Sequence, residues 1–154
     1  MKRTQFKRPT LAQVKAKQAL KRQKTPLKRK QKPKVIPISK LKKQLWDECR
    51  RITRKRFNCD GEYYCFTCGN LVAVPHTGHI IASSLSSAEM RYSLDNLRLQ
   101  CYMCNIYKSG NWVGFYEVLG KDYIDDLIKR NNESKGKSYH TDWYLNKIEE
   151  YKKL

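Results

Sequence analysis

The chain has 154 residues, which leaves room for one modest domain with appendages, because two independent hydrophobic cores rarely fit in so short a chain. Its formal net charge of +19 at pH 7 indicates a polyanionic partner, and nucleic acid is the first candidate. No apolar run approaches the roughly 20 residues that span a bilayer, and the start of the chain lacks the apolar segment of a secretory signal. We therefore expect a soluble protein of the cytoplasm with no membrane partner.

Positive charge is concentrated at the start of the chain, before the first acidic residue, Asp47. Residues 1–38 are also rich in proline and poor in large apolar side chains, which is typical of a disordered or weakly helical arm. Within this arm, Thr10 can cap a helix over residues 10–24 that forms on contact with phosphate. We expect the arm to bind DNA, and a solvated tail that aids solubility is the alternative interpretation. The predicted DNA contacts of the arm are Lys28, Arg29 and Lys30.

The body of the protein is predicted to span residues 39–154 and to begin with a helix over residues 39–57, capped by Ser39. Apolar side chains recur there at helical spacing, and Trp46 and Phe57 add apolar surface. The residues at helical spacing are Leu41, Leu45, Cys49 and Ile52. The other face is basic, and it either follows a DNA backbone or faces water. Its predicted DNA contacts are Arg50, Arg51 and Arg54.

The centre and end of the chain predict a mixed α+β fold. In residues 63–74, aromatic and β-branched residues flank a Cys-Gly-Asn turn, which predicts a β-hairpin with its second strand at Leu71 to Val74. Beyond the central segment, residues 63–111, we expect helices within residues 112–154. Their predicted bounds are 112–119, 121–130 and 141–151. Aromatic residues recur there at helical spacing, which predicts core positions rather than platforms for stacked bases. These residues are Trp112, Phe115, Tyr116 and Trp143.

Four of the six cysteines form two CxxC pairs with the spacing C-x2-C-x32-C-x2-C. They are Cys65, Cys68, Cys101 and Cys104. In a reducing cytosol this spacing predicts metal binding, and four thiolates can close a tetrahedral site around Zn²⁺. Four sulfur ligands leave no open position for water, so we expect this zinc to be structural. Free or disulfide-bonded cysteines are the alternative, and Cys49 and Cys59 have no assigned role.

The residues between and just after the two cysteine pairs resemble the HNH, or ββα-metal, nuclease motif, in its endonuclease VII-like branch. In that motif a β-hairpin presents a histidine, a loop supplies an asparagine, and a helix returns a metal ligand. The corresponding positions are His79 in GHII, Asn96 in DNLRLQC, and Asn105 directly after Cys104. The resemblance implies a small zinc-stapled ββα-metal core with flanking α-helices.

The run CNIYKSGN, the Gly-His pair and the Asp before Asn96 are similar to the lambda Rap (NinG) family of phage recombination endonucleases. The similarity covers residues 41–154 and leaves out the basic arm. It implies a structure-specific endonuclease that hydrolyses phosphodiester bonds in branched DNA, such as Holliday junctions and D-loops. If the chain is phage-encoded, its place of action is the cytoplasm of the host cell.

The resemblance also implies a role for each matched residue. His79 would be the general base that takes a proton from the attacking water, which suits an imidazole that titrates near neutral pH. Asn105 would bind a catalytic Mg²⁺ or Mn²⁺ ion, which polarises the scissile phosphate. Asn96 would tie the loop to the backbone and so fix the base, and Lys108 would reach a phosphate oxygen.

Many HNH nucleases carry an acidic residue or a second His directly before the base, as a ligand of the catalytic metal. This chain has Gly78 at that position, as does the Rap-like motif itself. Another residue must then complete the site. Asp95 is the first candidate, although it can equally cap the loop, and Glu89 and His76 follow as second and third. Apart from this candidacy, we expect His76 and His140 to be surface residues.

Two other functions stay open at this level. The first is a zinc-dependent nucleic-acid-binding protein without catalysis, and the second is an HNH nuclease of restriction, homing or packaging type. His79 together with Asn105 favours catalysis, because a pure binder needs no base beside a metal ligand. No dedicated recognition helix is evident, which favours recognition of DNA shape over base sequence. Cleavage of two opposed junction strands would most simply use a homodimer.

Overall fold

The protein is described here by a computed structural model, in which residues 9–22 and 36–154 are described. The chain divides into two units, Met1–Val35 and Ile36–Leu154. In the first unit, helix α1 (Leu11–Arg22) lies within the predicted range of 10–24, and the side chains of residues 11–21 are exposed.

Helix α1 begins with half of a capping box. The backbone N–H of Thr10 donates to Oε1 of Gln13 at 3.1 Å, which satisfies a donor that the helix itself leaves free. The predicted phosphate contacts Lys28, Arg29 and Lys30 lie outside the described residues.

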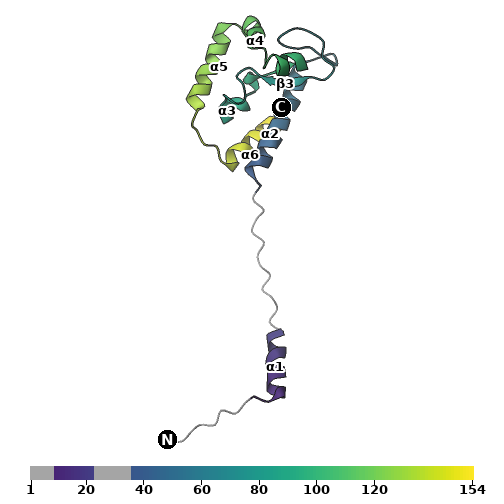
Figure 1. The fold of residues 1–154 in the computed structure, drawn as a ribbon, viewed down its shortest axis with the longest axis vertical. Helices are drawn as coiled ribbons and strands as arrows, with labels where there is room; N and C mark the ends of the chain where they lie inside the picture. Colours follow the sequence, from purple (N-terminus) through teal and green to yellow (C-terminus); the bar gives the residue numbers. More distant parts are fainter. Residues whose placement is uncertain (1–8, 23–35) are drawn as a thin grey trace. The chain divides into compact units, whose positions relative to one another are not determined.

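The second unit (Figure 1) is a mixed α+β fold that combines helices with two small antiparallel sheets. Its elements are α2 (Ile38–Arg56), β1 (Asn58–Cys59), β2 (Glu62–Tyr63), β3 (His76–His79), α3 (Ala88–Arg91), η1 (Leu94–Asn96), β4 (Leu97–Gln100), η2 (Met103–Tyr107), α4 (Trp112–Leu119), α5 (Lys121–Ser134) and α6 (Thr141–Lys152). The three predicted C-terminal helices are confirmed, with α5 running a full turn further than expected. No helix in the described part of the chain has the length and apolar character needed to cross a membrane.

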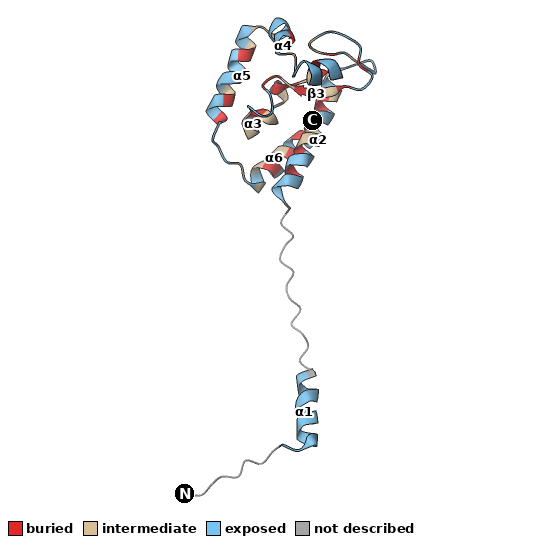
Figure 2. Cartoon of the chain, in the orientation of Figure 1, coloured by how far each residue is buried: buried red, intermediate tan, exposed pale blue. Residues whose placement is uncertain are grey.

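Helix α2 packs along α6, and this pair forms the larger hydrophobic cluster (Figures 1 and 2). All four apolar residues predicted from helical spacing in α2 are buried. They meet the α6 residues Tyr144, Ile148 and Tyr151. Removing this much apolar surface from water is the main favourable term in folding the body.

The start of α2 differs from the prediction. The helix begins at Ile38, so Ser39 is not its cap. Pro37 holds that position, and its carbonyl accepts hydrogen bonds from the amides of Lys40 and Leu41 at 3.0 and 3.3 Å. Proline fixes φ near −60°, which prepares the chain for entry into the helix.

Strands β3 and β4 form the sheet that carries the functional residues. They pair antiparallel, with His76 opposite Gln100 and His79 opposite Leu97. The loop between them, which contains α3, folds over a second hydrophobic cluster. That cluster consists of Ile80, Ile81, Met90, Phe115, Ile124 and Leu127.

The hairpin predicted over residues 63–74 is confirmed only in part, because no regular strand forms at Leu71 to Val74. Only Tyr64 and Leu71 form a bridge there, and regular pairing lies earlier, between β1 and β2. The Cys65 amide donates to the Asn70 carbonyl, and the Cys65 carbonyl accepts from the Gly69 amide, both at 2.8 Å. These bonds curl the chain into a tight turn that presents thiols, so an extended ladder cannot form.

Of the four aromatic residues predicted as core, Phe115 is fully buried and Trp143 is half-buried. The prediction is wrong for Trp112 and Tyr116, which are each 44% exposed. Helix α4 is short, and its buried residues are Gly114 and Phe115, so its other side chains face outward.

Candidate functional site

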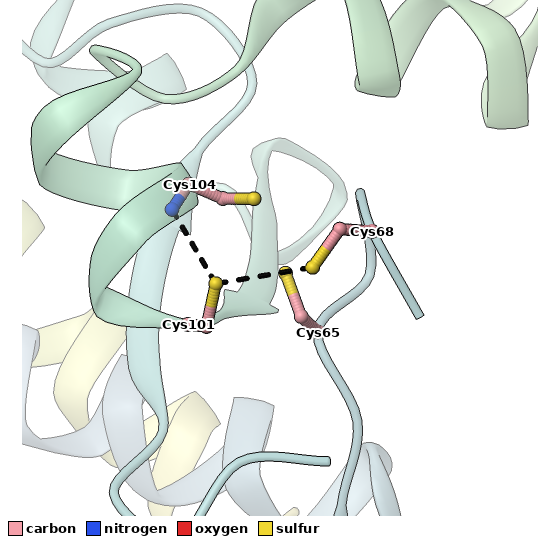
Figure 3. A group of neighbouring side chains, drawn as sticks. All are labelled: Cys65, Cys68, Cys101 and Cys104. Atoms are coloured by element: carbon pink, nitrogen blue, oxygen red, sulfur yellow. Dashed lines mark hydrogen bonds between the residues drawn. The ribbon is translucent and has the colours of Figure 1, made fainter. Parts of the chain in front are cut away.

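The four predicted zinc ligands converge at one point (Figure 3). Cys65 and Cys68 lie on the turn after β2, Cys101 directly follows β4, and Cys104 lies in η2. Their Sγ atoms all lie within 4.8 Å of one another, with 3.9 Å between those of Cys68 and Cys101. In a tetrahedral zinc site with Zn–S bonds of about 2.3 Å, sulfur atoms are about 3.8 Å apart. The cluster can therefore hold a metal ion such as zinc, and four sulfur ligands would leave no position for water.

Hydrogen bonds to sulfur prepare this cluster for a cation. The Cys104 amide donates to Cys101 Sγ at 3.4 Å, and Asn111 Nδ2 donates to Cys104 Sγ at 3.6 Å. Burial raises the pKa of the Cys65 thiol, but hydrogen bonds from Thr67 and nearby amides outweigh it and lower the pKa to about 6. Burial, together with the neighbouring thiols, raises the pKa of Cys68 to about 12. The fold alone favours one thiolate, and a metal ion would supply the charge that stabilises the others.

His79 ends strand β3, and its ring is held on two sides. Nε2 lies 3.0 Å from the carbonyl oxygen of Arg91, and the Trp46 ring of α2 stacks on the imidazole at 5.0 Å with an interplanar angle of 7°. Because a carbonyl can only accept, Nε2 carries the proton, and Nδ1 is unprotonated in the neutral ring. Burial lowers the pKa of His79 below its ordinary value of 6.5. The ring is therefore neutral at pH 7, and Nδ1 can take up a proton.

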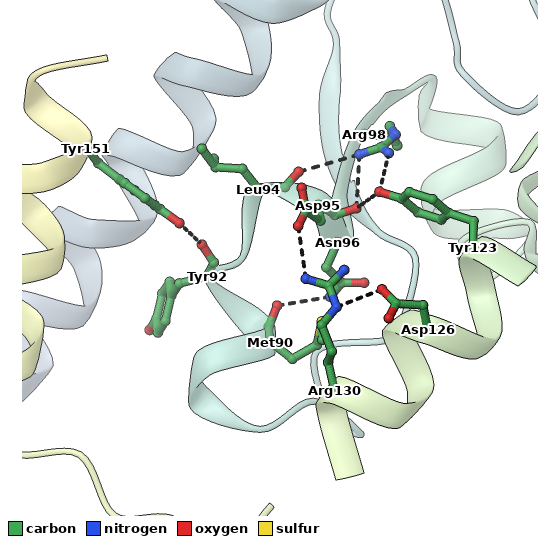
Figure 4. Close-up of polar contacts among 10 residues, drawn as sticks. All are labelled: Met90, Tyr92, Leu94, Asp95, Asn96, Arg98, Tyr123, Asp126, Arg130 and Tyr151. Atoms are coloured by element: carbon green, nitrogen blue, oxygen red, sulfur yellow. Dashed lines mark hydrogen bonds and ion pairs between the residues drawn. The ribbon is translucent and has the colours of Figure 1, made fainter. Parts of the chain in front are cut away.

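Asn96 fastens the two chain segments that hold His79, and Figure 4 shows its contact with Met90 on one of them. This side chain is fully buried, and its Oδ1 accepts from the Ile81 amide at 2.7 Å. Its Nδ2 donates to the carbonyls of Ile81 and Met90, both at 3.2 Å. Ile81 follows His79 by two residues, and Met90 directly precedes Arg91. One amide group therefore fixes both the strand end that carries the imidazole and the carbonyl that orients it.

Asn105 lies in η2, next to strand β3. Its Nδ2 lies 3.4 Å from Nδ1 of His76, which is half-buried rather than at the surface as expected. A methyl carbon on Gly78 would lie 3.1 Å from Asn105 Oδ1 and only 2.1 Å from Oε1 of Gln100. The fold therefore favours glycine at position 78, because any side chain there would have to displace the amide group of Gln100.

Three hollows follow helix α2. The arginine hollow is lined by Asp47, Arg50, Arg51, Arg54, Lys55 and Tyr63. The central hollow, of about 240 Å³, is lined by Trp46, Arg50, Arg54, Val74, Pro75, His76, Thr77 and Asn105. The histidine hollow is lined by Trp46, His79, Ser83, Ser84, Arg91 and Tyr92. Neighbouring hollows share Arg50 and Arg54 or share Trp46, so they adjoin along one basic groove.

The other predicted DNA contacts differ in the bonds that their side chains form within the protein. Arg51 binds Glu48 at 2.7 Å and the Tyr151 carbonyl at 2.8 Å, so it also joins α2 to α6. Arg50 lies 3.8 Å from Asp47, which is a weak exposed pair. Lys108 follows η2 with its side chain exposed.

The first two candidates for the missing metal ligand have other partners. The Asp95 carboxylate forms an ion pair with Arg130 at 3.0 Å (Figure 4), and Glu89 accepts from the Tyr139 hydroxyl at 2.7 Å. His76, the third candidate, is the one that the structure places beside Asn105.

Sequence reasoning missed Trp46, the Arg91 carbonyl and Gln100 as parts of the site. A signal existed for Trp46, because Trp46, Arg50 and Arg54 recur every four residues and so share one face of α2. Gln100 gives no local signal, since its position over Gly78 depends on how β4 pairs with β3.

The geometry defines a class of protein: a small α+β protein with a four-cysteine cluster that can hold a metal ion and a basic groove that leads to a histidine. All of residues 1–154 match the family described as Bacteriophage Lambda NinG protein, and the chain belongs to this NinG family.

The curated relatives match a shorter stretch. The protein ninG of Escherichia phage lambda is 26% identical over 77 residues, which cover 47% of this chain and 38% of the phage protein. The ninG proteins of Escherichia phage 933W and Enterobacteria phage VT2-Sa match with the same identity and coverage. The matched stretch is thus less than half of the length of these relatives. No solved structure matches the chain.

Proposed function

We propose that the protein is a metal-dependent DNA endonuclease of the HNH, ββα-metal type, acting on branched recombination intermediates such as Holliday junctions and D-loops. The observation that carries the proposal is the basic groove along α2. In its central hollow, Arg50 and Arg54 lie together with Asn105, and the adjoining hollow contains His79. Phosphate-binding charge, an oxygen ligand for a metal and a neutral imidazole thus lie along one surface.

In this proposal His79 is the general base. Its Nδ1 accepts a proton from the attacking water, while Nε2–H stays bonded to the Arg91 carbonyl. That bond prevents the ring from turning and strengthens as the ring gains positive charge. The low pKa keeps the base unprotonated at neutral pH, so no proton has to leave before the reaction begins.

Asn105 would hold the catalytic ion, for which its amide oxygen is a suitable hard ligand. When bound, Mg²⁺ or Mn²⁺ polarises the scissile phosphate and stabilises the leaving oxygen. Asn105 is also fixed in place, because it directly follows Cys104 within η2 and its own backbone amide donates to the Cys101 carbonyl at 3.0 Å. The thiolate centre therefore supports the catalytic residues without taking part in hydrolysis.

Arg50, Arg54 and Lys108 would bind the phosphates of the DNA strand that enters the groove, and the basic arm would bind flanking duplex. Contacts of this kind recognise the backbone and its shape rather than base sequence. Affinity should fall steeply between about 50 and 200 mM salt, because each neutralised phosphate releases counterions.

The test is cleavage of a labelled four-way junction and of a linear duplex of matched sequence, each with Mg²⁺ or with EDTA. We expect the junction to be cut in Mg²⁺ only, and the duplex much more slowly. Equal cutting of both substrates would keep the nuclease and remove the preference for branches. Tight binding without any cleavage would overturn the proposal in favour of a non-catalytic nucleic-acid-binding protein.

A further inference from the structure

We propose that Gln100 is a ligand of the catalytic metal, which it shares with Asn105, and that its side chain replaces the one that Gly78 lacks. This inference deepens the proposed function and rests on it only for the use of the ion in hydrolysis. Gln100 is the last residue of β4, and neither its sequence position nor the family resemblance marks it.

The amide group of Gln100 has a defined orientation. The side chain is fully buried, and Nε2 donates to the Gly110 carbonyl at 2.7 Å and to Thr67 Oγ1 at 3.0 Å. Because the Gly110 carbonyl can only accept, the atom facing it must be the nitrogen. Oε1 therefore points the other way, toward Gly78.

Oε1 of Gln100 has no hydrogen-bond partner anywhere in residues 9–22 and 36–154, although it is buried. Buried acceptors are almost always paired, since an unpaired one loses its bonds to water without replacement. A ligand that offers positive charge at this point would satisfy the oxygen.

A second oxygen converges on the same place. The position that a methyl carbon on Gly78 would take lies 2.1 Å from Gln100 Oε1 and 3.1 Å from Asn105 Oδ1. Two amide oxygens from separate elements, β4 and η2, thus lie on the same side of Gly78. Asn105 also lines the central hollow, which places its side chain beside the basic groove.

The chemistry of two neutral oxygen donors suits Mg²⁺ or Mn²⁺. Mg²⁺ keeps several waters and commonly uses few protein ligands, with a substrate phosphate completing the site. A site without a carboxylate should hold the ion weakly until DNA supplies negative charge. Asp95 is a poorer ligand, because Arg130 already neutralises its carboxylate.

The inference can be tested in the wild-type chain by paramagnetic NMR, with the structural zinc in place and its content measured throughout. We expect added Mn²⁺ to broaden the side-chain amide signals of Gln100 and Asn105. The signals of Asn131, a buried amide that binds Ser87 and Leu85, should stay sharp at the same Mn²⁺ concentration. A sharp Gln100 signal, or equal broadening of Asn131, would overturn the proposal.

Variants give a second measurement. Gln100→Met keeps the length of the side chain but removes Oε1, and we expect the broadening of Asn105 to require at least about tenfold more Mn²⁺, a factor typical of losing one metal-site partner. Asp95→Asn should leave the Mn²⁺ response unchanged. An unchanged response in a folded Gln100→Met variant, or its loss in Asp95→Asn, would contradict the assignment.

The failure of this inference is distinct from failure of the proposed function. Mn²⁺ binding at Gln100 without DNA cleavage would keep the metal site and remove the nuclease. Metal-dependent cleavage with a sharp Gln100 signal would keep the nuclease and remove Gln100 as a ligand.

Discussion

Replacing Asn96 with alanine tests whether one buried amide holds the His79 environment together. The change removes three hydrogen bonds, two to Ile81 and one to the Met90 carbonyl. It leaves the Ile81 amide without a partner, while the carbonyls of Ile81 and Met90 keep bonds from Ser86 Oγ and from the Ser93 amide. Each of the three lost bonds costs about 1 kcal/mol. We expect the free energy of unfolding to fall by about 3 kcal/mol, measured by urea denaturation of the zinc-loaded chain.

The effect of Asn96→Ala on the His79 ring is a second measurement beside the free energy of unfolding. Because Asn96 fixes Ile81 and Met90, its loss should loosen the packing around the His79 ring and admit water. Burial is the main cause of the lowered His79 pKa, so NMR should detect a rise of this pKa toward 6.5. Asn131→Ala is the matched control, since Asn131 ties the same loop through Ser87 and Leu85.

The control should lower stability while leaving the His79 pKa unchanged. A loss below about 1 kcal/mol for Asn96→Ala, or equal shifts of the His79 pKa in both variants, would refute this reasoning.

Four further predictions follow from the same structure. Removal of zinc by a strong chelator should unfold the segment around the cysteines, because metal binding supplies the free energy that folds this segment. Circular dichroism would detect the unfolding, and unchanged spectra would contradict the prediction. Since burial lowers the pKa of His79, this residue is protonated at a lower pH in the folded state than in the unfolded chain. The difference in the free energy of unfolding between wild type and His79→Gln should thus be largest above pH 6.5. It should decline as the pH falls from 6.5 through the pKa of His79 in the folded state. Gly78→Ala should lower the free energy of unfolding by about 1 to 3 kcal/mol, because the added methyl group overpacks the space beside Gln100. The loss should be smaller in a Gln100→Ala background, and an equal loss in both backgrounds would refute the clash with Gln100. Arg54→Ala should weaken junction binding and its salt dependence, whereas Lys129→Ala on α5 should not, as a filter-binding titration would show.

Local patterns were sufficient for much of the fold. Helical spacing predicted the buried face of α2, because four apolar residues on one stripe have only one favourable place to go. The cysteine cluster was equally predictable, since each CxxC pair forms within a single turn. The predicted strand after Cys68 failed because backbone bonds around the thiols curl the chain before it can extend.

Contacts between residues far apart in the sequence explain the site residues that local patterns did not predict. Trp46 reaches His79 only because α2 lies along β3, and Gln100 covers Gly78 only because of the β3–β4 pairing. The exposed Trp112 also shows that local spacing does not reveal which side of a helix other elements cover. Its spacing suits a core position, but α4 buries only Gly114 and Phe115.

The central claim is that His79 performs chemistry in a protein whose thiolate centre serves structure. The most direct measurement compares single-turnover junction cleavage by wild type, His79→Ala and His140→Ala, an exposed histidine outside the groove. Zinc content and junction affinity are measured in parallel. The account predicts that His79→Ala keeps zinc and DNA binding but cleaves at least about 100-fold more slowly, while His140→Ala cleaves normally. Cleavage by His79→Ala at the wild-type rate would contradict it.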